Sequence, residues 1–363
     1  MSHITTAEST RKLIVAGAQL GPVHLDSRRE ETVERMLRLM DDAHKQKVQL
    51  IVFPELALVT FFPRHLLEGD DLEQYFEQEV DGDIAKSPNI RKLFDRAREY
   101  KMDMYLGYAE CSGSDHQHYN TAVYYSGVLG KVVSKYRKVH LPGTFEPYKT
   151  KGATQQMEKR YFKPGDFGFE AFRVPGLLPD ALKSSSEVRA NSPGTEGKGD
   201  PIMGMLICND RRWPEGWRAY GLQGIELLLC GYNTTSWAPD LFGTTKKTST
   251  PEKAKTEALF HNKLAVTYNS YANSCFCINV AKCGPEDGIY PMIAGSSIVD
   301  CDGEIVVEAQ TEGDELIVAE IDLGECRRGK EKMFAFEKHR RIEHYGLISQ
   351  QTGIREPELL CDD

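Results

Sequence analysis

The stretch VQLIVFPE, residues 48–55, decides the fold class, because an apolar run this continuous is typical of a strand buried on both faces. Such a strand belongs to a sheet that is covered by helices. The residues before it fit that arrangement: LIVAGAQL at 13–20 is a second apolar strand, and residues 28–47 carry apolar side chains at helical spacing, namely Val33, Met36, Leu37 and Met40. The order strand, helix, strand predicts an α/β fold.

The same alternation continues along the chain. Further helices are predicted over 89–100, 213–224 and 251–264. Further strands are predicted at 102–110, 202–210, 225–233, 274–284, 295–310 and 315–323, with a two-stranded hairpin within 120–141. We therefore expect one α/β domain over residues 1–363, with a core from about 12 to 325 and one or two sheets covered by helices.

Composition excludes several classes of protein. The chain has 363 residues, 40% of them hydrophobic, and a net charge of −9, which argues against binding to nucleic acid. No apolar run approaches the roughly 20 residues that span a membrane, and the first residues, MSHITTAESTRK, lack the apolar core of a signal peptide. We expect a cytoplasmic enzyme with a small-molecule substrate and no membrane or nucleic-acid partner.

The cysteines and histidines do not form a recognisable metal motif. Cys275 and Cys277 alternate within an apolar run, which favours burial in a strand over metal binding, and His116 and His118 are predicted to lie in a polar surface loop. No cofactor motif is present, so we expect neither a metal nor a cofactor. An odd number of cysteines without an export signal predicts free thiols; the nine are Cys111, Cys208, Cys230, Cys275, Cys277, Cys283, Cys301, Cys326 and Cys361.

Two segments fall outside the regular pattern. Residues 184–200, SSSEVRANSPGTEGKGD, offer too little apolar surface to order themselves, which predicts a flexible surface insertion that is dispensable for chemistry. The charged tail at about 327–363 is expected either to pack on a partner subunit or to extend into solvent.

Three reactive side chains fall where predicted strands end. Glu55 closes the strand at 48–55, Lys138 lies near the end of a strand in the hairpin, and Cys208 follows the apolar part of 202–210. Taken singly, each residue fits an ordinary structural role: Cys208 that of a buried core residue, Glu55 that of an exposed turn residue and Lys138 that of a solvated side chain. Together they predict a site at one sheet edge, where α/β folds place their chemistry. A helix that begins at Pro214 is expected to favour the Cys208 thiolate.

The motifs around these residues resemble those of a known family. FPE at 53–55, YRKVHLPG at 136–143 and CNDRRWPE at 208–215 are similar to the Glu, Lys and Cys motifs of the nitrilase superfamily, in that order. The resemblance is greatest to its N-carbamoyl-D-amino acid amidohydrolase branch, through QMEKRYFKPGD at 156–166, GYNT at 231–234 and EHYGLI at 343–348.

The resemblance implies a fold and catalytic roles. The fold is a four-layer αββα sandwich, and family members associate as dimers or tetramers. Cys208 would be the nucleophile and Glu55 the general base. Lys138 would stabilise the oxyanion, and Glu158 would position the substrate and the lysine.

The same resemblance implies a substrate. Arg211 and Arg212 would hold the α-carboxylate of an N-carbamoyl amino acid, unless one of them forms an internal salt bridge with Asp210 or Glu215. Further polar contacts to the substrate are expected from Asn233, Thr234 and His140. Gln156 is a departure, because the branch commonly has a histidine just before the segment that contains Glu158.

The implied activity is hydrolysis of N-carbamoyl-D-amino acids to the amino acid, ammonia and carbon dioxide. The alternatives within this chemistry are an aliphatic amidase, a β-ureidopropionase or a nitrilase. A non-catalytic thiol or redox protein is disfavoured, because such a protein needs neither Glu55 nor Lys138.

Overall fold

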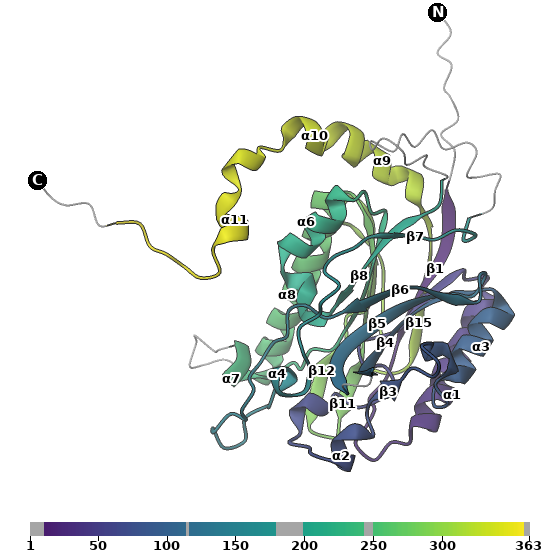
Figure 1. Ribbon diagram of the computed structural model, residues 1–363, viewed down its shortest axis with the longest axis vertical. Helices are drawn as coiled ribbons and strands as arrows, with labels where there is room; N and C mark the ends of the chain where they lie inside the picture. Colours follow the sequence, from purple (N-terminus) through teal and green to yellow (C-terminus); the bar gives the residue numbers. More distant parts are fainter. Residues whose placement is uncertain (1–10, 114–115, 179–198, 243–249, 359–363) are drawn as a thin grey trace, which may run out of the picture.

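Two β-sheets lie face to face between two layers of helices in the computed structural model, which describes residues 11–113, 116–178, 199–242 and 250–358 (Figure 1). In these residues one sheet has seven strands in the order β15-β1-β2-β4-β5-β6, with β3 paired to β4. Its strands are β1 (Lys12–Gln19), β2 (Leu50–Val52), β3 (Glu77–Gln78), β4 (Asp103–Ser112), β5 (Gln117–Ser126), β6 (Lys131–Arg137) and β15 (Glu315–Asp322).

The second sheet has six strands among the described residues, in the order β14-β13-β10-β9-β8-β7. These are β7 (Phe172–Arg173), β8 (Ile202–Ile207), β9 (Leu227–Tyr232), β10 (Phe276–Ala281), β13 (Ser297–Val299) and β14 (Ile305–Glu308). β11 (Cys283–Glu286) and β12 (Tyr290–Ile293) form a separate hairpin. The central strands β8, β9 and β10 run parallel, so their carboxyl ends share one edge.

Helices cover both outer faces. Met36 of α1 (Arg29–Lys45) and Phe94 of α3 (Arg91–Tyr100) pack on the first sheet. Trp217 of α6 (Pro214–Leu222) and Val266 of α8 (Pro251–Asn273) pack on the second. The predicted four-layer αββα sandwich is therefore confirmed.

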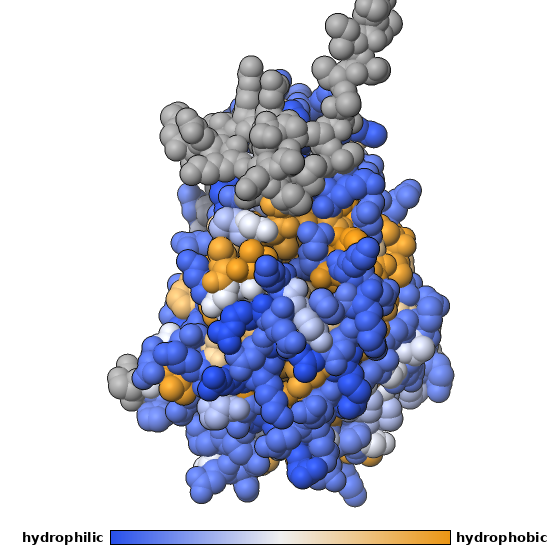
Figure 2. All heavy atoms as spheres, turned by 90° about the vertical axis from the view of Figure 1, so that its right-hand side faces the viewer, coloured by the Kyte–Doolittle hydropathy of each residue, from blue (hydrophilic) through white to orange (hydrophobic). Residues whose placement is uncertain are grey.

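The lower part of the face beside α1 and α3 is mostly hydrophilic at its surface (Figure 2).

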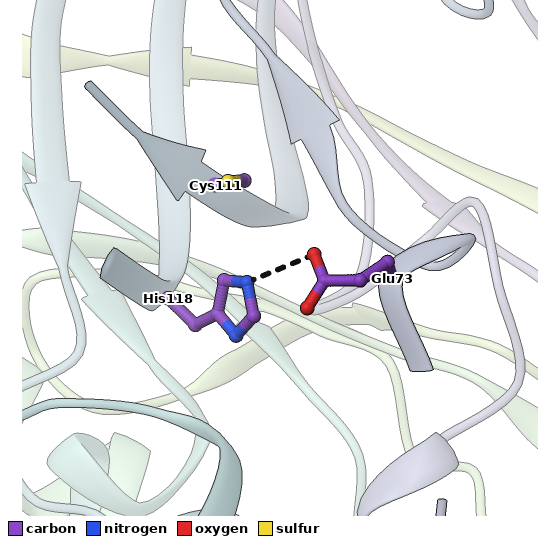
Figure 3. A group of neighbouring side chains, drawn as sticks. All are labelled: Glu73, Cys111 and His118. Atoms are coloured by element: carbon purple, nitrogen blue, oxygen red, sulfur yellow. Dashed lines mark hydrogen bonds and ion pairs between the residues drawn. The ribbon is translucent and has the colours of Figure 1, made fainter. Parts of the chain in front are cut away.

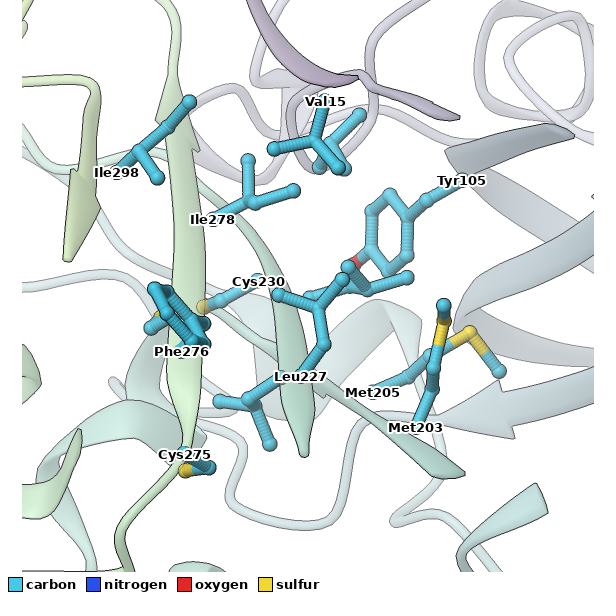
Figure 4. Packing of buried hydrophobic residues seen from close by; sticks show 14 of the residues in the cluster. Val15, Tyr105, Met203, Met205, Leu227, Cys230, Cys275, Phe276, Ile278 and Ile298 are labelled. Atoms are coloured by element: carbon cyan, nitrogen blue, oxygen red, sulfur yellow. The ribbon is translucent and has the colours of Figure 1, made fainter. Parts of the chain in front are cut away.

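The inner faces of the two sheets share one hydrophobic core. Val15 and Tyr105 come from the first sheet, and Met205, Leu227 and Ile278 come from the second, all almost fully buried (Figure 4). Because each central strand is covered on both sides, these strands read as continuous apolar runs in the sequence.

Several predicted boundaries need correction. β2 stops at Val52, because Pro54 has no N–H to continue the ladder. α8 continues to Asn273, past the predicted end at 264, although its second half is rich in asparagine and aromatic residues. His118 lies in β5 and not in a loop, while His116 does lie in a turn. The predicted insertion at 184–200 lies outside the described residues except for 199 and 200.

The tail after β15 forms short helical turns that lead away from the sandwich. α9 (Cys326–Arg328), α10 (Phe336–His339) and α11 (Gly346–Gln350) form an arc beside α6 and α8 (Figure 1). Within the described residues no helix is both long and apolar enough to cross a membrane. All eight described cysteines are free, as predicted, and all eight are buried, as predicted for Cys275 and Cys277.

Two glycines allow the sheets to close around the segment that carries Glu55. A Cβ atom on Gly107 of β4 would lie 2.6 Å from the Pro54 carbonyl oxygen, and one on Gly231 of β9 would lie 2.5 Å from the Glu55 nitrogen. Real Cβ atoms do not approach backbone this closely. The Pro54–Glu55 backbone is therefore held between strands of both sheets.

We predict that Gly231→Ala lowers the free energy of unfolding by about 1–3 kcal/mol, the usual cost of overpacking, and also lowers kcat by displacing Glu55. Denaturant unfolding and steady-state kinetics measure both effects. Gly313→Ala is the matched control, because nothing lies within 4 Å of the added Cβ. Unfolding and kinetics like those of the wild type in Gly231→Ala would contradict the close approach.

Candidate active site

Cys208 lies at a sharp junction between strand and helix. β8 ends at Ile207, and a 3₁₀ helix spans Cys208–Arg212. Cys208 has φ +49°, a left-handed conformation that is uncommon outside glycine and concentrates at functional sites. Its side chain is 5% exposed, and Sγ donates a hydrogen bond to the Asn233 carbonyl oxygen at 3.1 Å.

A buried ammonium between two carboxylates lies beneath this junction. Lys138 follows β6, Glu55 follows β2, and Glu158 is the first residue of α4 (Glu158–Tyr161); all three have 0% exposure. Lys138 Nζ donates to Glu55 Oε1 at 2.7 Å and to Glu158 Oε2 at 2.6 Å. The structure thus brings Glu55 and Lys138 together with Glu158, and Cys208 lies close enough to interact electrostatically with all three.

The two carboxylate oxygens of Glu55 differ in their hydrogen bonding. Its Oε1 accepts from Lys138 and also from Asn120 Nδ2 at 2.7 Å. Its Oε2 is buried and has no hydrogen-bond partner among the described residues. A buried carboxylate oxygen without a partner is costly and calls for an explanation. An oxygen in this state can accept a proton from a thiol or a water, which is what a general base requires.

The resting protonation state differs from the one expected from sequence. Burial, then the negative charge of Glu55, raises the pKa of Cys208 to about 11, against the opposing effect of Lys138 and Arg211. The expected helix stabilisation of a thiolate is thus outweighed by desolvation, and the thiol is neutral at pH 7. Burial also disfavours charge on Lys138, but the carboxylates of Glu158 and Glu55, and Cys208 once its thiol ionises, raise the pKa of the Lys138 ammonium.

A pocket opens above Cys208 and gives it access to a small molecule. Its lining combines amide, hydroxyl and guanidinium groups with a few apolar side chains. The lining residues are Pro142, Gln156, Cys208, Asn209, Arg212, Asn233, Thr234, Thr235, Ala238 and Leu241. The predicted contacts Asn233 and Thr234 are therefore in the pocket wall.

The two arginines after Cys208 have different surroundings. Arg211 is 1% exposed, and its guanidinium donates to Asn262 Oδ1 at 2.8 Å, to the Cys208 carbonyl oxygen at 2.6 Å and to Thr234 Oγ1 at 3.1 Å. It does not line the pocket. Arg211 is thus bonded within the protein, as the alternative to a substrate-binding role required. Its partners are Asn262, Cys208 and Thr234, and not Asp210 or Glu215.

Arg212 is the arginine that faces the pocket. The Arg212 residue as a whole is exposed to solvent. Protein atoms around its guanidinium partly displace water, and this desolvation, followed by repulsion from Arg211, lowers the pKa of Arg212 to about 10. It is still a cation at pH 7.

His140 lies outside the pocket lining. Its Nδ1 is 2.8 Å from Asp210 Oδ1, and its ring stacks on Trp213 at 4.9 Å. Asp210 also accepts from Tyr136, so these residues fix the helix that follows Cys208. The predicted substrate contact from His140 is therefore not supported by its position.

Two positioning residues were missed or misjudged from sequence. Asn120, an amide within the apolar strand β5, holds Glu55 and was not identified; its burial in an apolar run was the available signal. Gln156, which stands where a histidine was expected, donates from Nε2 to Glu158 Oε1 at 2.8 Å. An amide therefore supplies the hydrogen bond to the second glutamate.

Comparisons with known proteins identify relatives of this chain. The carbon-nitrogen hydrolase family profile matches residues 14–331. An N-carbamoylputrescine amidase from Oryza sativa subsp. japonica is 25% identical over 94% of this chain and 96% of its own. A citrullinase from Francisella tularensis is 24% identical over 88% of this chain and 92% of its own.

Solved structures share the fold. A carbon-nitrogen hydrolase from Helicobacter pylori G27 superposes with a TM-score of 0.70 at 20% identity, covering 94% of this chain and 99% of its own. An amidase from Nesterenkonia sp. gives 0.61 at 18% identity, covering 92% and 95%. These relatives do not narrow the chain to the N-carbamoyl-D-amino acid branch. The extent of the family match establishes the broader assignment: this chain is a member of the carbon-nitrogen hydrolase family, the nitrilase superfamily.

Proposed function

We propose that this hydrolase cleaves N-carbamoyl amino acids, with a preference for the D configuration, to the free amino acid, ammonia and carbon dioxide. The observation that carries the proposal is the position of Arg212, a cation in the wall of the pocket that contains Cys208. A guanidinium there suits a substrate carboxylate. The preference for D rests on the resemblance of the segments around Glu158 and Cys208 to that branch.

The first half of the reaction forms a covalent intermediate. Glu55 Oε2 takes the proton of the neutral Cys208 thiol as sulfur attacks the carbamoyl carbon. The Lys138 ammonium stabilises the oxyanion, which carries its charge only in the transition state and intermediate. The C–N bond to the amino acid then breaks, and the leaving amine receives the proton from Glu55.

The second half releases the carbamoyl group. Glu55, again a carboxylate, removes a proton from water, which attacks the carbamoyl thioester. The carbon–sulfur bond breaks, and Cys208 regains its proton. The carbamate product decomposes to ammonia and carbon dioxide. Asn120 and Glu158 hold Glu55 and Lys138 in place throughout.

The pocket chemistry separates the alternatives. N-carbamoylputrescine carries a terminal amine, which needs an acidic partner, and none of the described lining residues is Asp or Glu. Simple amides and nitriles have no group for Arg212. β-Ureido acids keep the carboxylate one carbon further away, so they are the nearest competitors. A panel of N-carbamoyl D- and L-amino acids, a β-ureido acid and N-carbamoylputrescine tests these alternatives.

Cys208→Ala should abolish turnover and leave the melting temperature nearly unchanged, because only a sulfur atom is lost. Glu55→Gln should slow alkylation of Cys208 by iodoacetamide at pH 7 by roughly 10²–10⁴-fold, since general-base assistance is lost. Glu55→Gln removes the negative charge that also raises the thiol pKa, but burial remains and still raises it, so alkylation of this variant should become faster as the pH rises.

Inactivation rates across pH measure this dependence, with the exposed Glu331→Gln as control. A Glu55→Gln protein that is alkylated at the wild-type rate at pH 7 would remove Glu55 from the role of base. Wild-type turnover in Cys208→Ala would refute the proposed nucleophile.

Arg212→Ala should lower kcat/KM for N-carbamoyl amino acids by about 10- to 150-fold, since a charge-assisted hydrogen bond contributes about 1.5–3 kcal/mol. Hydrolysis of the decarboxylated analogue should change little. Arg211→Ala is the comparison: it should impair both substrates and lower the melting temperature, because Arg211 anchors buried groups. If Arg212→Ala lowers kcat/KM equally for both substrates, Arg212 does not bind the carboxylate, and the protein would be a generic amidase.

We also propose that the chain forms homodimers, which can pair as tetramers, through the outer face of α8. Phe260, Leu264, Tyr268 and Tyr271 recur at helical spacing and are 39–61% exposed. The neighbouring tail exposes Leu347 and Ile348 as well, at 71% and 63%. An apolar stripe of this kind on a soluble protein is typical of a protein interface, and a second copy offers a matching stripe.

Leu264→Arg should shift the chain to monomers in size-exclusion chromatography with light scattering, because two buried cations would face each other across the dimer. Ile289→Arg is the control, since Ile289 is 70% exposed in the turn between β11 and β12 and does not belong to the apolar stripe of α8. A wild-type monomer, or an unchanged oligomer in Leu264→Arg, would contradict the interface.

A further inference from the structure

A group of metal-binding side chains lies outside the catalytic pocket, where β4 and β5 meet the end of α2 (Asp70–Glu73). Glu73, Cys111 and His118 each offer one ligand atom, and these atoms all lie within 4.8 Å of one another. Figure 3 shows the His118 ring facing the Glu73 carboxylate, with Cys111 on the adjacent strand. None of these residues takes part in the proposed hydrolysis.

The backbone fixes two of the three ligands. Cys111 and His118 are directly opposite each other in the antiparallel pair β4–β5, which places their Cβ atoms about 4.5–5.5 Å apart on one face. The His118 ring is held flat against Phe76, with centroids 3.8 Å apart. Side chains that are oriented before binding lose little entropy when an ion arrives.

The third ligand needs only a small movement. His118 Nε2 is 3.2 Å from Glu73 Oε2. Bonds of about 2.0–2.3 Å to a tetrahedral ion place its ligand atoms about 3.3–3.8 Å apart. The Glu73 side chain is 48% exposed, so it is free to adjust and leaves the site open to solvent. His116 Nδ1, 3.5 Å from Cys111 Sγ, brings a second imidazole within reach of the ion.

We propose that Glu73, Cys111 and His118 form a binding site for Zn²⁺, with solvent or His116 as the fourth ligand. A thiolate, an imidazole and a carboxylate are the donors that Zn²⁺ prefers, whereas Mg²⁺ and Ca²⁺ prefer oxygen alone. The Cys111 thiol loses its proton to solvent as the sulfur–metal bond forms. The site is separate from the catalytic thiol but close to Asn120, which lies two residues further along β5.

Cobalt(II) titration of the full-length Cys208→Ala protein tests the site, because this background removes the catalytic thiol as a competing ligand. One equivalent of Co²⁺ should give a thiolate-to-metal charge-transfer band, and Zn²⁺ should displace it. Zn²⁺ should also raise the melting temperature, since a ligand that binds the folded state stabilises it.

Added Cys111→Ser should abolish the band. Glu73→Gln, introduced into the Cys208→Ala protein, changes an exposed residue and so preserves folding. It should weaken Co²⁺ binding more than about 10-fold, since loss of a residue that only hydrogen-bonds to a metal ligand already weakens binding by that much. Added Cys301→Ser is the matched control, because Cys301 is equally buried, and it should leave the band intact. Melting without metal verifies that each variant folds. Three results would overturn the proposal: no charge-transfer band in Cys208→Ala, a band that survives in Cys111→Ser, or a band that is lost in Cys301→Ser.

Discussion

One ammonium between two carboxylates, all fully buried, is the constraint on which the site depends. Lys138 is bonded to both Glu55 and Glu158, so the trio carries one net negative charge when all three are ionised. Removal of these groups from water is costly, and only close geometry with further hydrogen bonds offsets that cost. Asn120 and Gln156 supply those bonds. Burial, and then the negative charge of Glu55, also raises the pKa of the Cys208 thiol and keeps it protonated at pH 7, because a thiolate would add another charge to a site without water.

That constraint extends into the scaffold. The segment that carries Glu55 passes between Gly107 of one sheet and Gly231 of the other, at distances that exclude any side chain. Asn233 donates from Nδ2 to the Glu55 carbonyl oxygen at 2.8 Å, and its own carbonyl oxygen accepts from Cys208. The base and the nucleophile are therefore positioned by a common residue just past β9. A rigid sandwich is needed because neither group can move without breaking a buried hydrogen bond.

The arginine pair shows how adjacent residues of one kind take different roles. Arg211 turns inward, with its guanidinium over the Tyr232 ring at 4.2 Å and bonded to Asn262 of α8. It fixes the junction at which Cys208 has its left-handed backbone. Arg212 turns to the pocket and keeps its charge there. Of the two neighbouring arginines on this short helix, only Arg212 lines the pocket.

The sequence by itself determined the α/β class, because strands buried on both faces appear as apolar runs such as 48–55, and it placed Glu55, Lys138 and Cys208 at strand ends. Only the tertiary structure decided which arginine faces the pocket, that His140 does not, that the thiol is neutral, and that Asn120 holds the base. It also brought Glu73 to Cys111 and His118. Periodicity reports which side of an element is buried, whereas direction, desolvation and contacts between distant segments arise only when the two sheets pack together.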